Sequence, residues 1–168
     1  MMEHTLVIAF DLGTHAAGCV MLHEGTVKYH ETWNAKRGLS LYYRLEGLWE
    51  WELAMLNKTE HLVTCPVVAF ERPYYGGLFR ALQELYQVVG VLKIACLGHG
   101  AAAPIEIPPS SAKLALAGYG KAGKEQMVAA ATMQFPGFDW NEHTAAALGV
   151  ALACQALLKE RATLEEEE

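Results

Sequence analysis

The chain has 168 residues, 52% hydrophobic and 19% charged, which is typical of one globular domain with its own core and excludes a disordered or fibrous protein. The net charge is −6, but Glu165 to Glu168 supply −4 of it, so the remaining −2 argues only weakly against a nucleic-acid partner. No apolar run reaches the expected length of a transmembrane helix and the start lacks a basic signal segment, so we expect a cytoplasmic protein with no membrane partner.

The first part of the chain predicts strands. Residues 5–11 form an apolar run, and residues 16–23 follow after a Gly-Thr turn. Glu24-Gly25 is a hairpin turn signal, and residues 26–33 resume the extended pattern. The chain therefore opens with a predicted antiparallel meander of three strands.

Helices and strands alternate after the meander. Apolar residues recur at spacings of three and four over 39–57 and over 77–97, which predicts two helices. The segment 62–71 predicts a strand between them, and 103–107 predicts a short strand after them. The apolar residues of 77–97 lie on more than one face, which favours a subunit interface and therefore a homodimer.

Three helices are predicted in the last third. Ser110 resembles the N-cap of a helix that ends near residue 117. A glycine-rich loop over 118–123 precedes a helix over 124–134, and the last helix is expected over 141–161.

This order predicts an α/β fold with a mixed five-stranded sheet and helices on both faces. We assign residues 1–162 to a single domain and residues 163–168 to an acidic tail.

Two apolar strands end on a carboxylate. Residues 6–10 lead into Asp11, and residues 67–70 lead into Glu71. A buried ionised acid is costly unless it is paired or holds a metal ion. If the two strands are neighbours, their acids meet at one edge of the sheet and form a site for a hard cation.

Other metal chemistry is not indicated. The four cysteines are widely spaced in apolar segments and form no Cys-x-x-Cys pair. We therefore expect thiols in the core and no zinc site.

Four segments together resemble the RuvC-type Holliday junction resolvases of bacteria and phages, within the ribonuclease-H-like superfamily. The first two segments end on the acids: Ile8 to Thr14, and Ala69 to Gly76. The third combines Pro108 to Lys113 with Gly118 to Lys124, and the fourth runs from Glu142 to Ala151. The resemblance covers nearly the whole chain, and the four segments follow one another in the order and at the spacing of the family.

The resemblance implies a homodimeric endonuclease that nicks four-way DNA junctions symmetrically with two Mg²⁺ or Mn²⁺ ions. Asp11 would bridge both ions and Glu71 would bind one. The last helix would add His143 and position 146, one turn apart on one face. A branch-migration helicase is a possible partner within the family, in a bacterial cell or a phage-infected host.

Position 146 departs from the family pattern, because Ala146 stands where an acid is expected. Our leading interpretation is an inactivating replacement of that acid. The alternative is that Glu142 or Asp139 has taken over the role, and a natural loss of the acid would leave a non-catalytic junction-binding protein.

DNA contacts are implied near the same acids. Tyr74 occupies the place of the family's aromatic residue beside the active site, with Tyr75 as a second candidate. The basic residues expected to contact phosphates are Arg72, Arg80, Lys113, Lys121 and Lys124.

Two other functions compete with junction resolution. An RNA-processing nuclease of the same fold would keep the acids and change the substrate. Asp11 to Thr14 also resembles a phosphate loop of actin-like ATPases, but the chain has no second such loop and has room for only one of their two domains.

Overall fold

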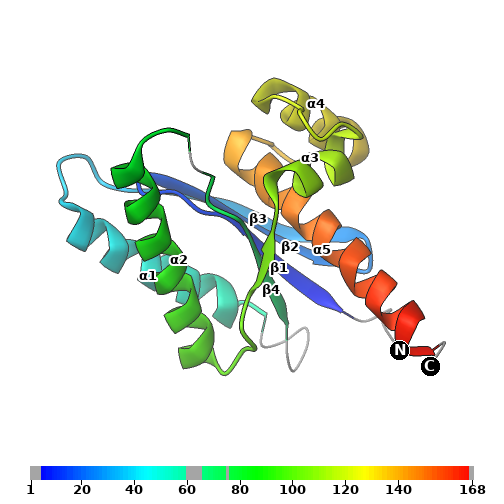
Figure 1. The fold of residues 1–168 in the computed structure, drawn as a ribbon, viewed down its shortest axis with the longest axis horizontal. Helices are drawn as coiled ribbons and strands as arrows, with labels where there is room; N and C mark the ends of the chain where they lie inside the picture. The colour runs from blue at the N-terminus through cyan, green and yellow to red at the C-terminus, as the bar shows by residue number, and fades with distance from the viewer. Residues whose placement is uncertain (1–4, 60–65, 75, 167–168) are drawn as a thin grey trace.

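The structure is a computed structural model that describes residues 5–59, 66–74 and 76–166. Its five strands form one sheet in the order β3-β2-β1-β4-β5 (Figure 1). The first three strands pair antiparallel, and β4 and β5 add parallel to β1. The strands are β1 (Leu6–Asp11), β2 (Ala16–His23), β3 (Thr26–Asn34), β4 (Val67–Glu71) and β5 (Ile105–Ile107). The predicted meander and mixed sheet are confirmed.

The helices lie on both faces of the sheet, as predicted (Figure 1). One face carries α1 and α2, and the other carries α5 with α3 and α4 beside it. The helices are α1 (Leu41–Asn57), α2 (Phe79–His99), α3 (Pro109–Ala117), α4 (Lys124–Gln134) and α5 (Glu142–Glu166).

Strand alternation divides the core into two layers. Val7 and Ala9 of β1 face the α5 side, whereas Leu6, Ile8 and Phe10 face α1 and α2. All five side chains are fully buried. Because helices cover both faces, β1 is a continuous apolar run rather than an alternating one.

The thiols lie in this core. Cys19, Cys96 and Cys154 are buried and free, which agrees with the expectation from sequence. Cys65 and the predicted start of the fourth strand at Leu62 lie outside the described residues.

Two helix boundaries differ from the sequence prediction. The N-cap of α3 is Pro108 rather than Ser110, and Pro109 occupies the first turn, where its missing N–H leaves no orphan donor. The helix α5 continues to Glu166, so the segment that we assigned to an acidic tail begins as helix.

Helix α2 also corrects the expectation about apolar length. Its 21 residues and mean hydropathy of 1.2 are sufficient, by length and composition alone, to cross a membrane. One side of α2 packs into the core through Val88, Leu92 and Ala95. A core helix of a soluble protein passes the same test, so this property is weak evidence for a membrane span.

Candidate active site at the ends of β1 and β4

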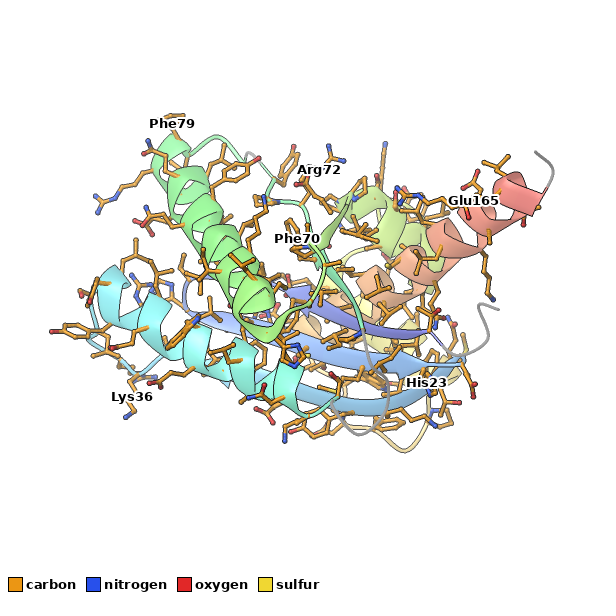
Figure 2. The ribbon with its side chains drawn as sticks, turned by 90° about the horizontal axis from the view of Figure 1, so that it is seen from below. His23, Lys36, Phe70, Arg72, Phe79 and Glu165 are labelled. Carbon is orange, nitrogen blue, oxygen red and sulfur yellow. The ribbon has the colours of Figure 1, made fainter. Side chains whose placement is uncertain are left out.

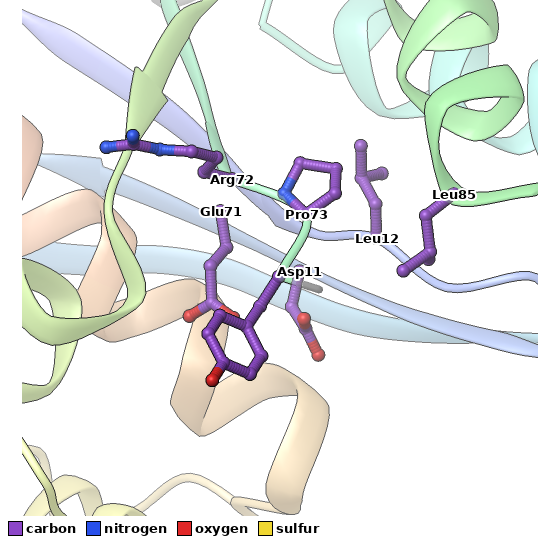
Figure 3. Close-up of a pocket in the computed structure, with 7 residues that line it drawn as sticks. Asp11, Leu12, Glu71, Arg72, Pro73 and Leu85 are labelled. Atoms are coloured by element: carbon purple, nitrogen blue, oxygen red, sulfur yellow. The ribbon is translucent and has the colours of Figure 1, made fainter. Parts of the chain in front are cut away.

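The two strand-end acids meet, as the sequence predicts. Parallel pairing of Phe10 with Phe70 brings Asp11 and Glu71 side by side at the carboxyl ends of β1 and β4. Figure 3 shows both carboxylates directed toward the same space. They line a pocket of about 210 Å³, which is completed by Leu12, Arg72, Pro73, Tyr74 and Leu85.

The electrostatics of this pair favour a bound cation. Burial and the neighbouring Asp11 carboxylate raise the pKa of Glu71 to about 7, and the Lys113 ammonium partly opposes this rise. Glu71 is therefore only partly ionised near neutral pH unless additional positive charge is present. A divalent cation would supply that charge.

His143 joins the acids from the first turn of α5. Its Nδ1 lies 2.8 Å from Oδ2 of Asp11. The hydrogen bond to Asp11 is the main cause that raises the pKa of His143 above its ordinary value. This contact links residues 132 positions apart in the chain, and it confirms that the last helix reaches the strand-end acids.

A capping residue fixes the start of α5. The side-chain Oδ1 of Asn141 accepts hydrogen bonds from the backbone N–H groups of His143 and Thr144, at 3.0 and 3.1 Å. Its Nδ2 donates to Oγ1 of Thr32 on β3 at 2.8 Å. Asn141 thus ties the first turn of α5 to the sheet and holds the His143 backbone in place.

Gly18 permits this close approach of helix to sheet. It pairs with Asp11 across β1 and β2, and a Cβ atom at this position would lie 2.3 Å from the carbonyl oxygen of His143. Any larger residue would push α5 away from the acids. Sequence reasoning did not identify Gly18, although a glycine inside an apolar strand is a signal of close backbone approach.

Position 146 supplies no metal ligand. Ala146 is partly exposed between the buried Ala145 and Ala147, one turn after His143. This placement agrees with the predicted shared face. The methyl side chain cannot replace the acid expected there.

The two alternative acids have other partners. Glu142 is exposed and pairs with Nζ of Lys124 at 2.5 Å, although its other oxygen lies 3.5 Å from Nε2 of His143. It is therefore closer to the site than its helical angle suggests. Asp139 is exposed in the loop before α5 and acts electrostatically on His30, and within the described residues no hydrogen bond or ion pair joins it to Asp11 or Glu71.

The donor set fits one hard cation better than two. Carboxylate oxygens of Asp11 and Glu71 are the ligands that Mg²⁺ and Mn²⁺ prefer. However, among the described residues no three His, Cys, Asp or Glu side chains are grouped closely enough to hold a metal ion. The acid that the resemblance implies at position 146 is absent, because Ala146 stands there.

The predicted phosphate-binding residues are not equivalent. Lys113 of α3 is partly buried and close enough to influence Glu71. Lys124 has its charge engaged by Glu142, and Lys121 is exposed in the turn between α3 and α4. Lys113 is thus the lysine with the clearest electrostatic link to the acids.

Of the DNA-contact residues predicted after β4, the two arginines are paired with acids and Tyr74 is exposed at the pocket. The Arg72 Nε lies 3.1 Å from Oε1 of Glu106, and Figure 3 shows the side chain turned away from the acids. Arg80 pairs with Glu84 one turn along α2. Tyr74 is 77% exposed at the pocket, whereas Tyr75 lies outside the described residues.

Comparison with solved structures places the fold in the ribonuclease-H-like class. RuvC from Thermus thermophilus superposes with a TM-score of 0.74 at 19% identity, over 93% of this chain and 97% of that one. The same protein in complex with a Holliday junction substrate gives a TM-score of 0.74 at 21% identity, over 89% and 92%.

A more distant likeness is to Ydc2, the yeast mitochondrial Holliday junction resolvase. The TM-score is 0.62 at 14% identity, over 98% of this chain and 85% of that one. No protein-family model and no curated protein sequence matches the chain. The chain therefore has the RuvC fold.

Proposed function

We propose that the protein is a metal-dependent crossover junction endodeoxyribonuclease, a hydrolase that resolves four-way DNA junctions by paired symmetric nicks. The observation that carries this proposal is the meeting of Asp11, Glu71 and His143 at one sheet edge. The likeness to RuvC, which has been solved with a Holliday junction substrate, supports the choice of substrate.

Asp11 and Glu71 would hold the metal, with His143 beside them. A bound Mg²⁺ or Mn²⁺ would polarise the phosphodiester and lower the pKa of a bound water. His143 is placed to hold or move a proton at Nε2, because Asp11 engages its Nδ1. Lys113 adds a positive charge for the phosphate near Glu71.

Tyr74 is the candidate for contact with unstacked bases at the crossover. Its exposed ring lies at the mouth of the acid pocket, and it follows Glu71 by three residues. An aromatic ring can stack on an open base of any sequence. This supports a site that recognises junction shape more than base sequence.

Paired nicks require two active sites, and α2 offers a surface for a homodimer. Its outward side exposes large apolar residues, which a monomer would leave in contact with water. These residues are Phe79, Tyr86, Ile94 and Leu97, exposed by 66, 52, 61 and 74%. An isologous contact through this face would bring two copies together with twofold symmetry.

In this proposal Ala146 weakens DNA cleavage but leaves DNA binding intact. The chain keeps the acid pair and the basic segment but lacks the fourth expected group. We therefore expect junction binding with weak cleavage, whether the acid was replaced or lost naturally.

A competition assay tests the proposed substrate. Labelled four-way junction is incubated with the protein in Ca²⁺ and challenged with unlabelled junction, duplex DNA or RNA–DNA hybrid. We expect only the junction to compete well. Equal competition by duplex would remove the junction from the proposal, and preferred competition by the hybrid would favour an RNA-processing nuclease of this fold.

A further inference from the structure

A basic and aromatic surface lies where α1 begins, apart from the acid pocket. We define this α1 entry surface by Lys36, Arg37, Tyr42, Tyr43 and Arg44. Lys36 and Arg37 are exposed in the loop after β3. Tyr42 and Tyr43 are 72% and 55% exposed, and their rings meet edge to face at 5.2 Å between centroids.

The α1 entry surface lies at the same end of the molecule as the acids. Helix α1 begins near the end of β1 (Figure 1), and Lys36 lies far from His23 and Glu165 in the view of Figure 2. Asp11 pairs with Gly18, and Ala16 pairs with Asn34. Asn34 at the end of β3 is therefore two strands away from Asp11 and offset by two residues along the strand direction. With the usual spacings of a sheet, this separation is roughly 12 Å.

A recess accompanies these side chains. It has a volume of about 390 Å³ and an apolar wall that includes Trp33, Leu39 and Tyr43. Lys36 and Arg44 line the same recess, and so do Glu46 and Glu50, which lie further along α1. The recess thus combines cations and rings near the acid pocket with negative charge at its far side.

Arg44 connects this recess to the loop after Asp11. Its Nη1 donates to the backbone oxygen of Thr14 at 3.0 Å and lies 2.7 Å from Nε2 of His15. Its Nε is buried and has no hydrogen-bond partner within the described part of the chain. The Nη1 contacts therefore hold the start of α1 against the loop that follows Asp11.

We propose that the α1 entry surface binds an unpaired stretch of the DNA strand whose scissile phosphate lies at Asp11. Lys36 and Arg37 hold backbone phosphates, and Tyr42 and Tyr43 stack on bases. The end of β3, just before Lys36, lies roughly 12 Å from Asp11, so one strand with its phosphate at Asp11 can reach this surface within a few nucleotides. This inference rests on the proposed junction-resolving function and extends its DNA footprint to α1.

Charge removal gives the first test. The dissociation constant for a labelled junction is measured in Ca²⁺ over a range of salt concentrations for the Lys36→Ala, Arg37→Ala double variant. We expect weaker binding and a salt slope reduced by about one and a half to two units, because two phosphate contacts are lost. Lys28→Ala is the matched control, since it removes an exposed lysine from the other end of β3.

Ring removal gives the second test. We expect Tyr43→Ala to weaken binding of the junction and of a short single-stranded oligonucleotide by about tenfold, and Tyr43→Phe to keep most of the affinity. Both rings are exposed, so these substitutions leave the core unchanged.

The outcomes separate this inference from the proposed function. If the unaltered protein shows no junction preference, the proposed function fails. If it binds the junction but the Lys36, Arg37 and Tyr43 variants bind as tightly as Lys28→Ala, the α1 entry surface is not a DNA site. A change of oligomeric state in these variants would instead assign the surface to contact between copies.

Discussion

At the residue scale, the site depends on how much negative charge a small buried space holds. Burial and Asp11 both raise the pKa of Glu71, and Lys113 only partly opposes them. The Nδ1 atom of His143 is hydrogen-bonded to Oδ2 of Asp11. A cation between the acids would remove the repulsion, so the arrangement favours metal binding over a purely structural role.

The two lysines of the basic segment should behave differently. We expect Lys113→Ala to weaken junction binding and lower its salt slope by about one unit, because one phosphate contact is lost. Lys124→Ala should have the smaller effect, since Glu142 already neutralises much of the Lys124 charge. Fluorescence anisotropy at several salt concentrations measures both slopes.

The Glu142 partner provides the control for this comparison. In a Glu142→Gln background the Lys124 charge is released, so Lys124→Ala should then change the slope more than in the unaltered chain. Equal slopes for Lys113→Ala and the unaltered protein would remove Lys113 from the phosphate-binding set.

At the element scale, α1 carries an acid into the core. Glu52 is completely buried between α1 and the sheet, and both of its carboxylate oxygens lack a hydrogen-bond partner within the described residues. Burial raises the pKa of Glu52 well above its ordinary value. The neutral acid is the form that this apolar layer tolerates.

Glu52 therefore predicts a pH-dependent stability. Below about pH 4.5 the acid is protonated in both folded and unfolded chains, and its stabilising contribution is complete. As the pH rises, the unfolded chain loses the proton while the folded chain keeps it. Stability should then fall by about 1.4 kcal/mol per pH unit, or about 4 °C in Tm, until the raised pKa is reached.

Thermal unfolding followed by circular dichroism from pH 4 to 8 checks this prediction. Glu52→Gln should flatten the dependence, whereas Glu50→Gln, which alters an exposed acid on the same helix, should not. An unchanged pH dependence in Glu52→Gln would contradict the buried neutral acid.

The exposed side of α2 leads to a prediction about assembly. Ile94→Glu would place a charge in the proposed dimer contact, where burying it without a partner is costly. We expect the variant to be monomeric by light scattering at concentrations where the unaltered chain is dimeric. Leu164→Glu changes an exposed apolar residue on α5 and serves as the control. A monomeric unaltered chain, or a dimeric Ile94→Glu variant, would exclude α2 as the interface.

Element type and order were predictable from local patterns, whereas precise ends and side-chain pairings were not. The helix over 124–134 matches α4, because Gly123 and Pro136 bound it. The prediction of Ser110 as the N-cap of α3 was wrong, because the helix already begins at Pro109, with Pro108 as its N-cap. The burial of Glu52 was not foreseen, since apolar periodicity does not show which polar residue turns inward.

At the scale of the whole molecule, chain topology makes the site. Parallel pairing of β1 with β4 brings Asp11 to Glu71, and Gly18 lets α5 approach with His143. The meeting of the acids was predictable because parallel strands end at one edge. The Lys124–Glu142 pair and the Arg44 link to Thr14 were not predictable, because they depend on tertiary approach between elements.

The most direct test of this account is single-turnover cleavage of a labelled four-way junction in Mg²⁺ or Mn²⁺, with Ala146→Asp and the uncharged control Ala146→Asn in parallel. We predict that the unaltered chain binds the junction but cuts slowly. Ala146→Asp should raise the rate about a hundredfold, because a completed metal site stabilises the transition state by several kcal/mol, and Ala146→Asn should not. Cleavage by the unaltered chain as fast as by Ala146→Asp would contradict the account.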